Sequence, residues 1–237
     1  MPDRLVLLDF DGTLASREGL WSGCAIEVLD EHLPGHGVER EHFREGMRGA
    51  YPWNRPDEAH RELSEPELWW EAMESRLADA FEQVGTAQEH RRSLARAVRE
   101  RFLDLPGWRL FDDTIPALRS LQQAGWRTAV LSNHVPELPD LVEGLGLSGL
   151  VEQVFSSATI GYEKPHPEAF RHALRACGSP EQVWMVGDNP IADVVGAEAV
   201  GVPAVLVRSQ GQASRRVDGL NEAVAMIIAQ ANICSPS

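Results

Sequence analysis

A short apolar run at residues 5–8 ends at two aspartates, Asp9 and Asp11, which are followed by Gly12 and Thr13. An apolar run of this length, bounded by polar residues, is typical of a strand that is buried on both faces of a parallel sheet. The carboxylates then lie where open α/β sheets bind their ligands, at the carboxyl end of the strand. Neighbouring carboxylates repel each other, and a cation or a shared proton relieves that repulsion.

After residue 105 the sequence alternates between helical and strand-like segments. Strand-like runs are expected at residues 4–9, 126–131, 151–155, 182–186 and 204–207. Helical segments are expected at residues 114–124, 136–145, 167–177, 191–200 and 221–231. This alternation predicts an α/β fold, with a central parallel sheet between two layers of helices in a Rossmann-like three-layer core.

Residues 17–105 have a different character, because they are rich in Arg, Glu and Trp and lack strand-like runs. Apolar residues recur at helical spacing in two places within this block. The two stripes are Trp69, Met73, Leu77, Phe81 and Val84, and Leu94, Val98 and Phe102. We therefore expect two parts, an α/β core formed by residues 1–16 and 106–237, and an all-helical insertion at residues 17–105.

The composition narrows the classes of function. The 237 residues carry a net charge of −14, which disfavours binding to nucleic acid or to an anionic membrane surface. Three widely spaced cysteines suggest neither a disulfide framework nor a zinc site. No apolar run is long enough to span a membrane. We expect a cytoplasmic protein, a monomer or homodimer, with no nucleic-acid or membrane partner.

Polar residues follow the later core strands as well. In chain order they are Ser132, Asn133, Lys164, Asp188 and Asp193. Because the carboxyl ends of parallel strands meet at one edge of a sheet, these side chains are expected near Asp9 and Asp11. His134, which comes next after Asn133, is interpreted as a loop histidine without a role.

In this order the residues resemble the haloacid dehalogenase superfamily, whose members include many phosphohydrolases. Four motifs carry the resemblance: DxDGT at residues 9–13, Ser132 after a strand, Lys164 before Pro165, and GDxxxxD at residues 187–193. The matching segments cover the whole predicted core. The helical insertion lies where that family places its cap.

The resemblance implies a metal-dependent reaction. Asp9 would be the nucleophile and form an aspartyl-phosphate, while Asp11 would act as general acid and then as general base. Asp9, the backbone carbonyl of Asp11 and Asp188 would hold the metal. Oxygen ligands of this kind suit Mg²⁺ better than zinc.

The same resemblance assigns the remaining residues. Ser132 and Lys164 would bind the phosphoryl oxygens, with Asn133 as a further substrate contact. Asp193 would support the metal site or Lys164 from behind. In the insertion, the loop at residues 51–61 is expected to close over the leaving group, with Arg55 as a candidate substrate contact.

Asp11 distinguishes between members of the family. The dehalogenases of this family carry a non-acidic residue at that position, because halide release needs no general acid. An acidic Asp11 favours an Mg²⁺-dependent phosphatase of a small phosphorylated metabolite. A 2-haloacid dehalogenase-type hydrolase and a phosphomutase stay open as alternatives, and a non-catalytic binding protein is a third.

Overall fold

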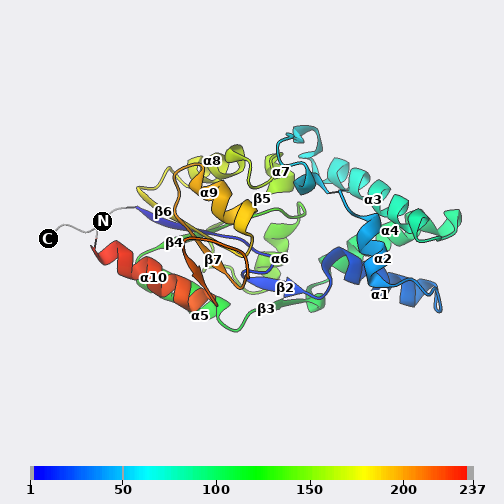
Figure 1. Cartoon of the computed structure of the whole chain (residues 1–237), viewed down its shortest axis with the longest axis horizontal. Coiled ribbons are helices and arrows are strands. Elements are labelled where there is room, and N and C mark those ends of the chain that lie inside the picture. Colours follow the sequence, from blue (N-terminus) through cyan, green and yellow to red (C-terminus); the bar gives the residue numbers. More distant parts are fainter. Residues whose placement is uncertain (1–2, 50, 234–237) are drawn as a thin grey trace.

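The computed structural model describes residues 3–49 and 51–233, in which an α/β core and a helical part lie end to end (Figure 1). The core of the described chain holds a six-stranded parallel sheet in the order β5-β4-β1-β6-β7-β8. Its strands are β1 (Arg4–Leu8), β4 (Arg127–Ser132), β5 (Gln153–Ser156), β6 (Gln182–Gly187), β7 (Ala204–Val207) and β8 (Arg216–Val217). The predicted central parallel sheet is confirmed, and β8 is an additional short strand.

The apolar run of β1 is buried on both faces of the sheet. Leu5 and Leu7 belong to one hydrophobic cluster, and Val6 and Leu8 belong to the other, because successive side chains of a strand alternate. The helices that cover the two faces are α5 (Thr114–Gln123) and α10 (Leu220–Ile233) on one, α8 (Pro167–Ala176) and α9 (Gly196–Glu198) on the other (Figure 1). Each buried aliphatic side chain contributes roughly 1.5–3 kcal/mol.

Strand β1 lies in the interior of the sheet, where Leu8 pairs with Val130 of β4 and with Val186 of β6. The chain extends the sheet to one side through β4 and β5 and to the other through β6 and β7. The carboxyl end of β1 is therefore at the point where the strand order reverses, which is where open α/β sheets form a ligand crevice.

The helical part leaves the core after β2 (Ala15–Arg17) and returns through β3 (Trp108–Leu110). These two strands pair antiparallel, and each is too short for a sequence pattern to predict. The helices between them are α1 (Leu20–His32), α2 (Arg40–Gly46), α3 (Pro66–Gln83) and α4 (Gln88–Leu103). The apolar stripes predicted on α3 and α4 are buried from Trp69 to Phe81 and from Leu94 to Phe102.

Aromatic side chains connect the helical part to the core beneath the sheet edge. Trp21 of α1 stacks on Phe102 of α4, with ring centroids 4.1 Å apart. Phe102 contacts Trp108 of β3, and Trp108 contacts Phe10 beside the first strand, at 5.4 and 5.3 Å. Such pairs add to the burial of apolar area and fix the contact geometry.

The remaining helical elements are short. They are α6 (Leu138–Gly144), α7 (Ser157–Ile160), the π-helix η4 (Pro190–Val195), and single turns at Pro52–Asn54, Arg61–Leu63 and Leu105–Gly107. The segment at residues 191–200, expected as one regular helix, is η4 followed by α9. In the part of the chain that the structure describes, no helix is long and apolar enough to cross a membrane.

Candidate active site

Asp9 directly follows β1 and stays in register with the sheet. Its backbone N–H donates to the carbonyl of Val186 at 2.9 Å, which continues the pairing of β1 with β6. The side chain is nearly buried, and Oδ1 accepts a hydrogen bond from Nζ of Lys164 at 2.8 Å. The sheet thus holds the backbone of Asp9, and the ammonium of Lys164 holds its carboxylate.

A tight turn after Asp9 brings Asp11 back to the same cavity. Gly12 has a φ of 74°, and a Cβ at this position would lie 2.4 Å from a carboxylate oxygen of Asp188. Only glycine adopts this backbone conformation at low cost and leaves that space free. The glycine of the first motif therefore allows the segments that follow β1 and β6 to approach each other.

Lys164 is buried and bridges two carboxylates, with Nζ 2.5 Å from Oδ1 of Asp193 and 2.8 Å from Asp9. Burial disfavours the charged ammonium, but Asp193 and Asp9 outweigh it, so the pKa of Lys164 is raised. The amide of Asn133 binds both backbone groups of Lys164, at 2.7 and 2.8 Å. The side chain of Asn133 thus positions Lys164, which leaves its backbone N–H for the expected substrate contact.

The acidic cluster has the composition of a magnesium site. Oxygens of Asp9, Asp188 and Asp193 all lie within 4.8 Å of one another. Asp193 already accepts from Lys164 and from the backbone N–H of Asn189, which leaves Asp9 and Asp188 to hold a cation. Desolvation, followed by the charges of Asp9 and Asp193, raises the pKa of Asp188 to about 7. A divalent cation would offset this repulsion, so the donor set fits Mg²⁺.

Asp11 and His134 face each other at the edge of the cavity. Desolvation, together with the charges of Asp9 and Asp188, raises the pKa of Asp11 well above its usual value. The imidazole of His134 is buried with Nε2 3.7 Å from Oδ2 of Asp11, and burial lowers its pKa to about 3. His134 lies in a loop, as expected from the sequence, but its buried, neutral side chain faces Asp11 instead of the solvent.

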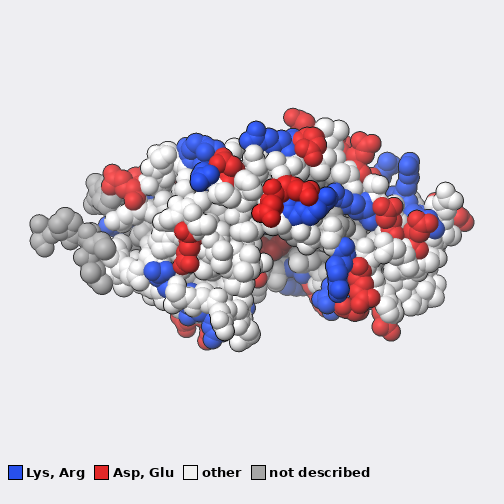
Figure 2. Space-filling model, turned by 45° about the horizontal axis from the view of Figure 1, so that its top comes forward, with Lys and Arg blue, Asp and Glu red and all other residues white. Residues whose placement is uncertain are grey.

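The site residues line one cavity of about 860 Å³, which is a typical size for a small-molecule site. From the core, the cavity is lined by Asp9, Asp11, Ser132, Asn133, His134, Lys164, Asp188 and Asp193. From β2 and the helical part, its charged and polar lining includes Arg17, Arg40, Glu41, Arg44, Arg48, Tyr51 and Asn54. The molecular surface is hollowed between the two parts, with charged side chains of both signs beside the hollow (Figure 2).

Arg55 is not brought to this cavity. Of the loop that contains it, Tyr51 and Asn54 line the cavity, whereas the half-exposed Arg55 forms an ion pair with Glu58 at 3.1 Å. The turn at Pro52–Asn54 directs the following residue to the surface. In contrast to the expectation from the sequence, Arg55 is therefore not among the residues that the structure brings to the cavity.

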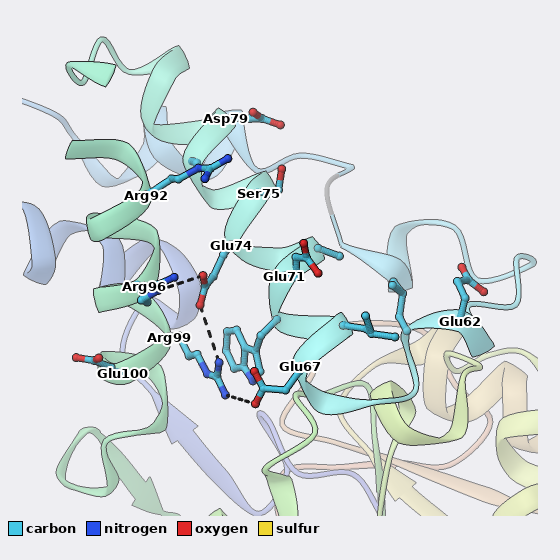
Figure 3. A pocket seen from close by; sticks show the side chains of 15 residues that line it. Glu62, Glu67, Glu71, Glu74, Ser75, Asp79, Arg92, Arg96, Arg99 and Glu100 are labelled. Carbon is cyan, nitrogen blue, oxygen red and sulfur yellow. Dashed lines mark ion pairs between the residues drawn. The ribbon is translucent and has the colours of Figure 1, made fainter. Parts of the chain in front are cut away.

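A larger concavity, of about 1130 Å³, lies between α3 and α4 and away from the sheet edge (Figure 3). Its basic residues are largely neutralised within the groove. Arg96 pairs with Glu74 at 3.6 Å, and Arg99 pairs with Glu74 and with Glu67, both at 3.9 Å. None of the motif residues lines it. The candidate active site is therefore the smaller cavity at the sheet edge, because the motif residues line it and not the larger groove.

The sequence motifs did not single out Glu163, although it directly precedes Lys164. Glu163 is fully buried, and its Oε1 lies 2.9 Å from Nε2 of His60 in the helical part. The backbone N–H of His60 donates to Gly161 at 3.0 Å. The helical part thus contacts the loop that carries Lys164, a long-range relationship that no local pattern indicates.

Comparison with known proteins shows the family to which the chain belongs. The profile of haloacid dehalogenase-like hydrolases matches residues 4–201, a range that contains all four motifs. A phosphoserine phosphatase of Thermus thermophilus is 39% identical over 131 residues, which are 54% of this chain and 51% of that enzyme. The chain belongs to the haloacid dehalogenase-like hydrolases. It spans about half the length of this curated relative.

Two solved structures share the fold over nearly their whole length. A HAD-hydrolase from Bacillus subtilis, YfnB, solved with bound magnesium, has a TM-score of 0.73 at 18% identity and covers 96% of this chain and 99% of its own. A 2-haloacid dehalogenase from Pseudomonas syringae has a TM-score of 0.66 at 24% identity, with 97% and 99% covered. At these identities the likeness shows the fold alone.

Proposed function

We propose that this protein is an Mg²⁺-dependent phosphatase that hydrolyses a small phosphorylated metabolite through an aspartyl-phosphate on Asp9. One observation carries the proposal. The acidic Asp11 lies beside Asp9 and Lys164 in one cavity, so that a nucleophile, a cation and a proton donor are within reach of the same phosphoryl group. The phosphatase activity named for the Thermus relative supports it.

In the first step the free carboxylate oxygen of Asp9 attacks phosphorus, and the bond from phosphorus to the leaving oxygen breaks. The raised pKa of Asp11 favours its protonated form, which gives its proton to that oxygen. The ammonium of Lys164 and the hydroxyl of Ser132 bind the phosphoryl oxygens, where negative charge builds up. The products of this step are the alcohol and an aspartyl-phosphate.

In the second step water attacks the same phosphorus, and the bond between phosphorus and the Asp9 oxygen breaks. Asp11, now ionised, takes a proton from that water. Inorganic phosphate leaves, and both aspartates return to their starting states. The covalent intermediate divides one difficult displacement into two easier ones.

Asp9, Asp188 and the backbone carbonyl of Asp11 would hold the magnesium ion. A bound Mg²⁺ would offset the repulsion between the carboxylates and the phosphate and polarise the phosphoryl oxygens. Asp193 would not bind the metal directly, since both of its oxygens are already hydrogen-bonded, and it would hold Lys164 in place.

Two other reactions of the family use a similar set of residues. A 2-haloacid dehalogenase needs the nucleophile but no acid two residues after it. The acidic Asp11 at that position therefore disfavours this reaction. A phosphomutase shares all four motifs and differs in returning the phosphoryl group to an organic acceptor. A protein that only binds its ligand would need neither the nucleophile Asp9 nor the proton donor Asp11, so the complete set of motif residues favours an enzyme.

The direct test is hydrolysis of p-nitrophenyl phosphate by the whole protein with Mg²⁺ and with EDTA. We expect turnover that EDTA abolishes and that Asp9→Asn lowers by at least 10³-fold, about 4 kcal/mol at the transition state. Asp79→Asn, at an exposed position of α3, is the matched control. Wild-type protein without activity, or Asp9→Asn with full activity, would overturn the mechanism.

Two further assays separate the alternatives. Chloride release from 2-chloropropionate in the presence of EDTA would indicate a dehalogenase. Transfer of phosphate between two organic substrates in place of free phosphate production would indicate a mutase. The proposed phosphatase gives stoichiometric inorganic phosphate and no chloride.

A further inference from the structure

The outer wall of the active-site cavity is basic. Arg40 and Arg44 lie one turn apart on α2, and Arg48 follows four residues later in the turn after this helix. This spacing brings the three side chains to one side of the segment. All three line the cavity that holds Asp9 and Lys164. The cavity therefore has a floor of the aspartates and Lys164 at the sheet edge, and a predominantly basic wall on the side of α2, where Glu41 is the one acidic lining residue among those that the structure describes.

Two of these guanidinium groups are available to a ligand. Arg44 pairs with Glu41 at 2.9 Å, whereas Arg40 and Arg48 have no ion-pair partner within residues 3–49 and 51–233. In the groove between α3 and α4, by contrast, Arg96 and Arg99 are both neutralised by glutamates of the groove. In a chain of net charge −14, unpaired arginines beside the catalytic cavity form a locally positive site for an anion.

The phosphoryl group that reacts does not account for this wall. The nucleophile, Lys164 and Ser132 all belong to the floor, at the ends of core strands and in the loop before α8. A substrate bound there extends its leaving group into the remaining cavity, toward α2. A guanidinium fork matches a carboxylate or a phosphate in a bidentate manner.

We propose that Arg40 and Arg48 bind a second anionic group on the leaving group of the substrate. The substrate is then a phosphate monoester that also carries a carboxylate or a further phosphate. This inference rests on the proposed phosphatase function and names the class of substrate. It also gives a physical reason why so acidic a chain would select a metabolite with a second anionic group.

Matched substrate pairs test the inference. O-phosphoserine and O-phosphoethanolamine differ by one carboxylate, and fructose 1,6-bisphosphate and fructose 6-phosphate differ by one phosphate. For the wild-type protein, kcat/KM should be at least about tenfold higher for the anion-bearing member of one pair, the effect of one charge-assisted hydrogen bond. The preferred pair tells carboxylate from phosphate. Equal values within both pairs would overturn the inference.

Variants of the wall provide the second arm. Arg40→Gln and Arg48→Gln should lower the selectivity ratio within the preferred pair by about tenfold each. Arg48→Lys should keep part of the ratio, and Arg48→Glu should reverse the preference between phosphoserine and phosphoethanolamine if carboxylate is preferred. Arg92→Gln, an exposed arginine of α4 outside the cavity, is the control and should keep the ratio.

The outcomes separate this inference from the proposed function. A wild-type selectivity ratio that persists in both Arg40→Gln and Arg48→Gln, with folding verified by circular dichroism, would overturn the role of the wall. Activity on p-nitrophenyl phosphate with equal kcat/KM values within both substrate pairs would overturn only the inference about Arg40 and Arg48. The absence of any Mg²⁺-dependent phosphatase activity would overturn the proposed function itself.

Discussion

The ammonium of Lys164 lies 2.5 Å from Oδ1 of Asp193, and both side chains are buried beneath the active-site cavity. The other oxygen of Asp193 accepts the backbone N–H of Asn189, which begins η4. One carboxylate thus fixes both the cation that faces Asp9 and the turn after β6. Its removal should affect stability and activity together.

Asp193→Asn should lower the free energy of unfolding by about 3 kcal/mol, the lower end of the cost of breaking a buried ion pair, because Asp9 still contacts Lys164. Urea unfolding at pH 7 in EDTA measures the change. Glu168→Gln, which breaks a surface pair with Arg171, is the control and should leave the midpoint nearly unchanged. Equal effects of the two substitutions would contradict a structural role for the buried pair.

Asp11→Asn should affect poor leaving groups most. An asparagine cannot donate the proton that an alkyl leaving group requires, so kcat for an alkyl phosphate should fall by about 10²–10⁴-fold. Loss of activity with p-nitrophenyl phosphate should be smaller, because its leaving group needs little assistance. Steady-state kinetics on both esters measure the two losses. Identical losses would indicate that Asp11 acts only as a metal ligand or by structure.

Mg²⁺ should stabilise the folded protein. A ligand present at about 100 times its dissociation constant contributes about 2.7 kcal/mol when it binds the folded state alone. The resulting rise in Tm should disappear in Asp188→Asn and persist in Asp79→Asn, whose side chain is on the exposed face of α3. Differential scanning fluorimetry with Mg²⁺ and with EDTA gives this comparison. A shift that survives in Asp188→Asn would place the metal elsewhere.

Stability should fall in mild acid because of His134. Its pKa is lowered to about 3 by burial, while in the unfolded chain it is about 6.5, so only the unfolded state takes up a proton between these values. The folded state should lose about 1.5 kcal/mol between pH 6.5 and pH 5 from this group. His134→Gln should show a shallower dependence in urea unfolding, whereas exposed His90→Gln should behave as the wild type. If the free energy of unfolding depends on pH in the same way in all three proteins, His134 is not a buried neutral group.

The contact between His60 and Glu163 should couple the helical part to the loop of Lys164. The two side chains are buried, and Nε2 of His60 lies 2.9 Å from Oε1 of Glu163. A double-mutant cycle with His60→Gln and Glu163→Gln should give a coupling energy of about 1 kcal/mol or more in the free energy of unfolding. Purely additive effects would show that the contact is incidental.

Local patterns predicted much of the core. The apolar run at residues 5–8 is buried on both faces of β1, because a strand inside a parallel sheet is covered by helices on either side. The stripes on α3 and α4 are buried at the predicted positions except Val84, which follows the end of α3 and is partly buried, since helical spacing collects the others on one face. The residues that follow β1, β4 and β6 meet at one edge, as parallel topology requires.

Those local patterns could not predict the contacts between segments that are distant in the chain. The ribbon of β2 and β3 pairs segments that are separated by the whole helical part. Arg55 was chosen from its polarity and position in a loop, but a turn directs it to the surface, and arginines of α2 line the cavity in its place. Neither periodicity nor composition carries information on which face of one element meets another.

The sequence by itself determined the main strands of the sheet and the four motifs, because each of these is a pattern of residues close together in the chain, and parallel topology then places the motifs at one edge. Only the tertiary structure decided how those residues are used. Asn133 holds the backbone of Lys164, His134 is a neutral neighbour of Asp11, and Glu163 meets His60. These roles depend on burial and on distances between segments far apart in sequence, which are set by packing within the core and, for His60 and Glu163, by packing of the helical part on the core.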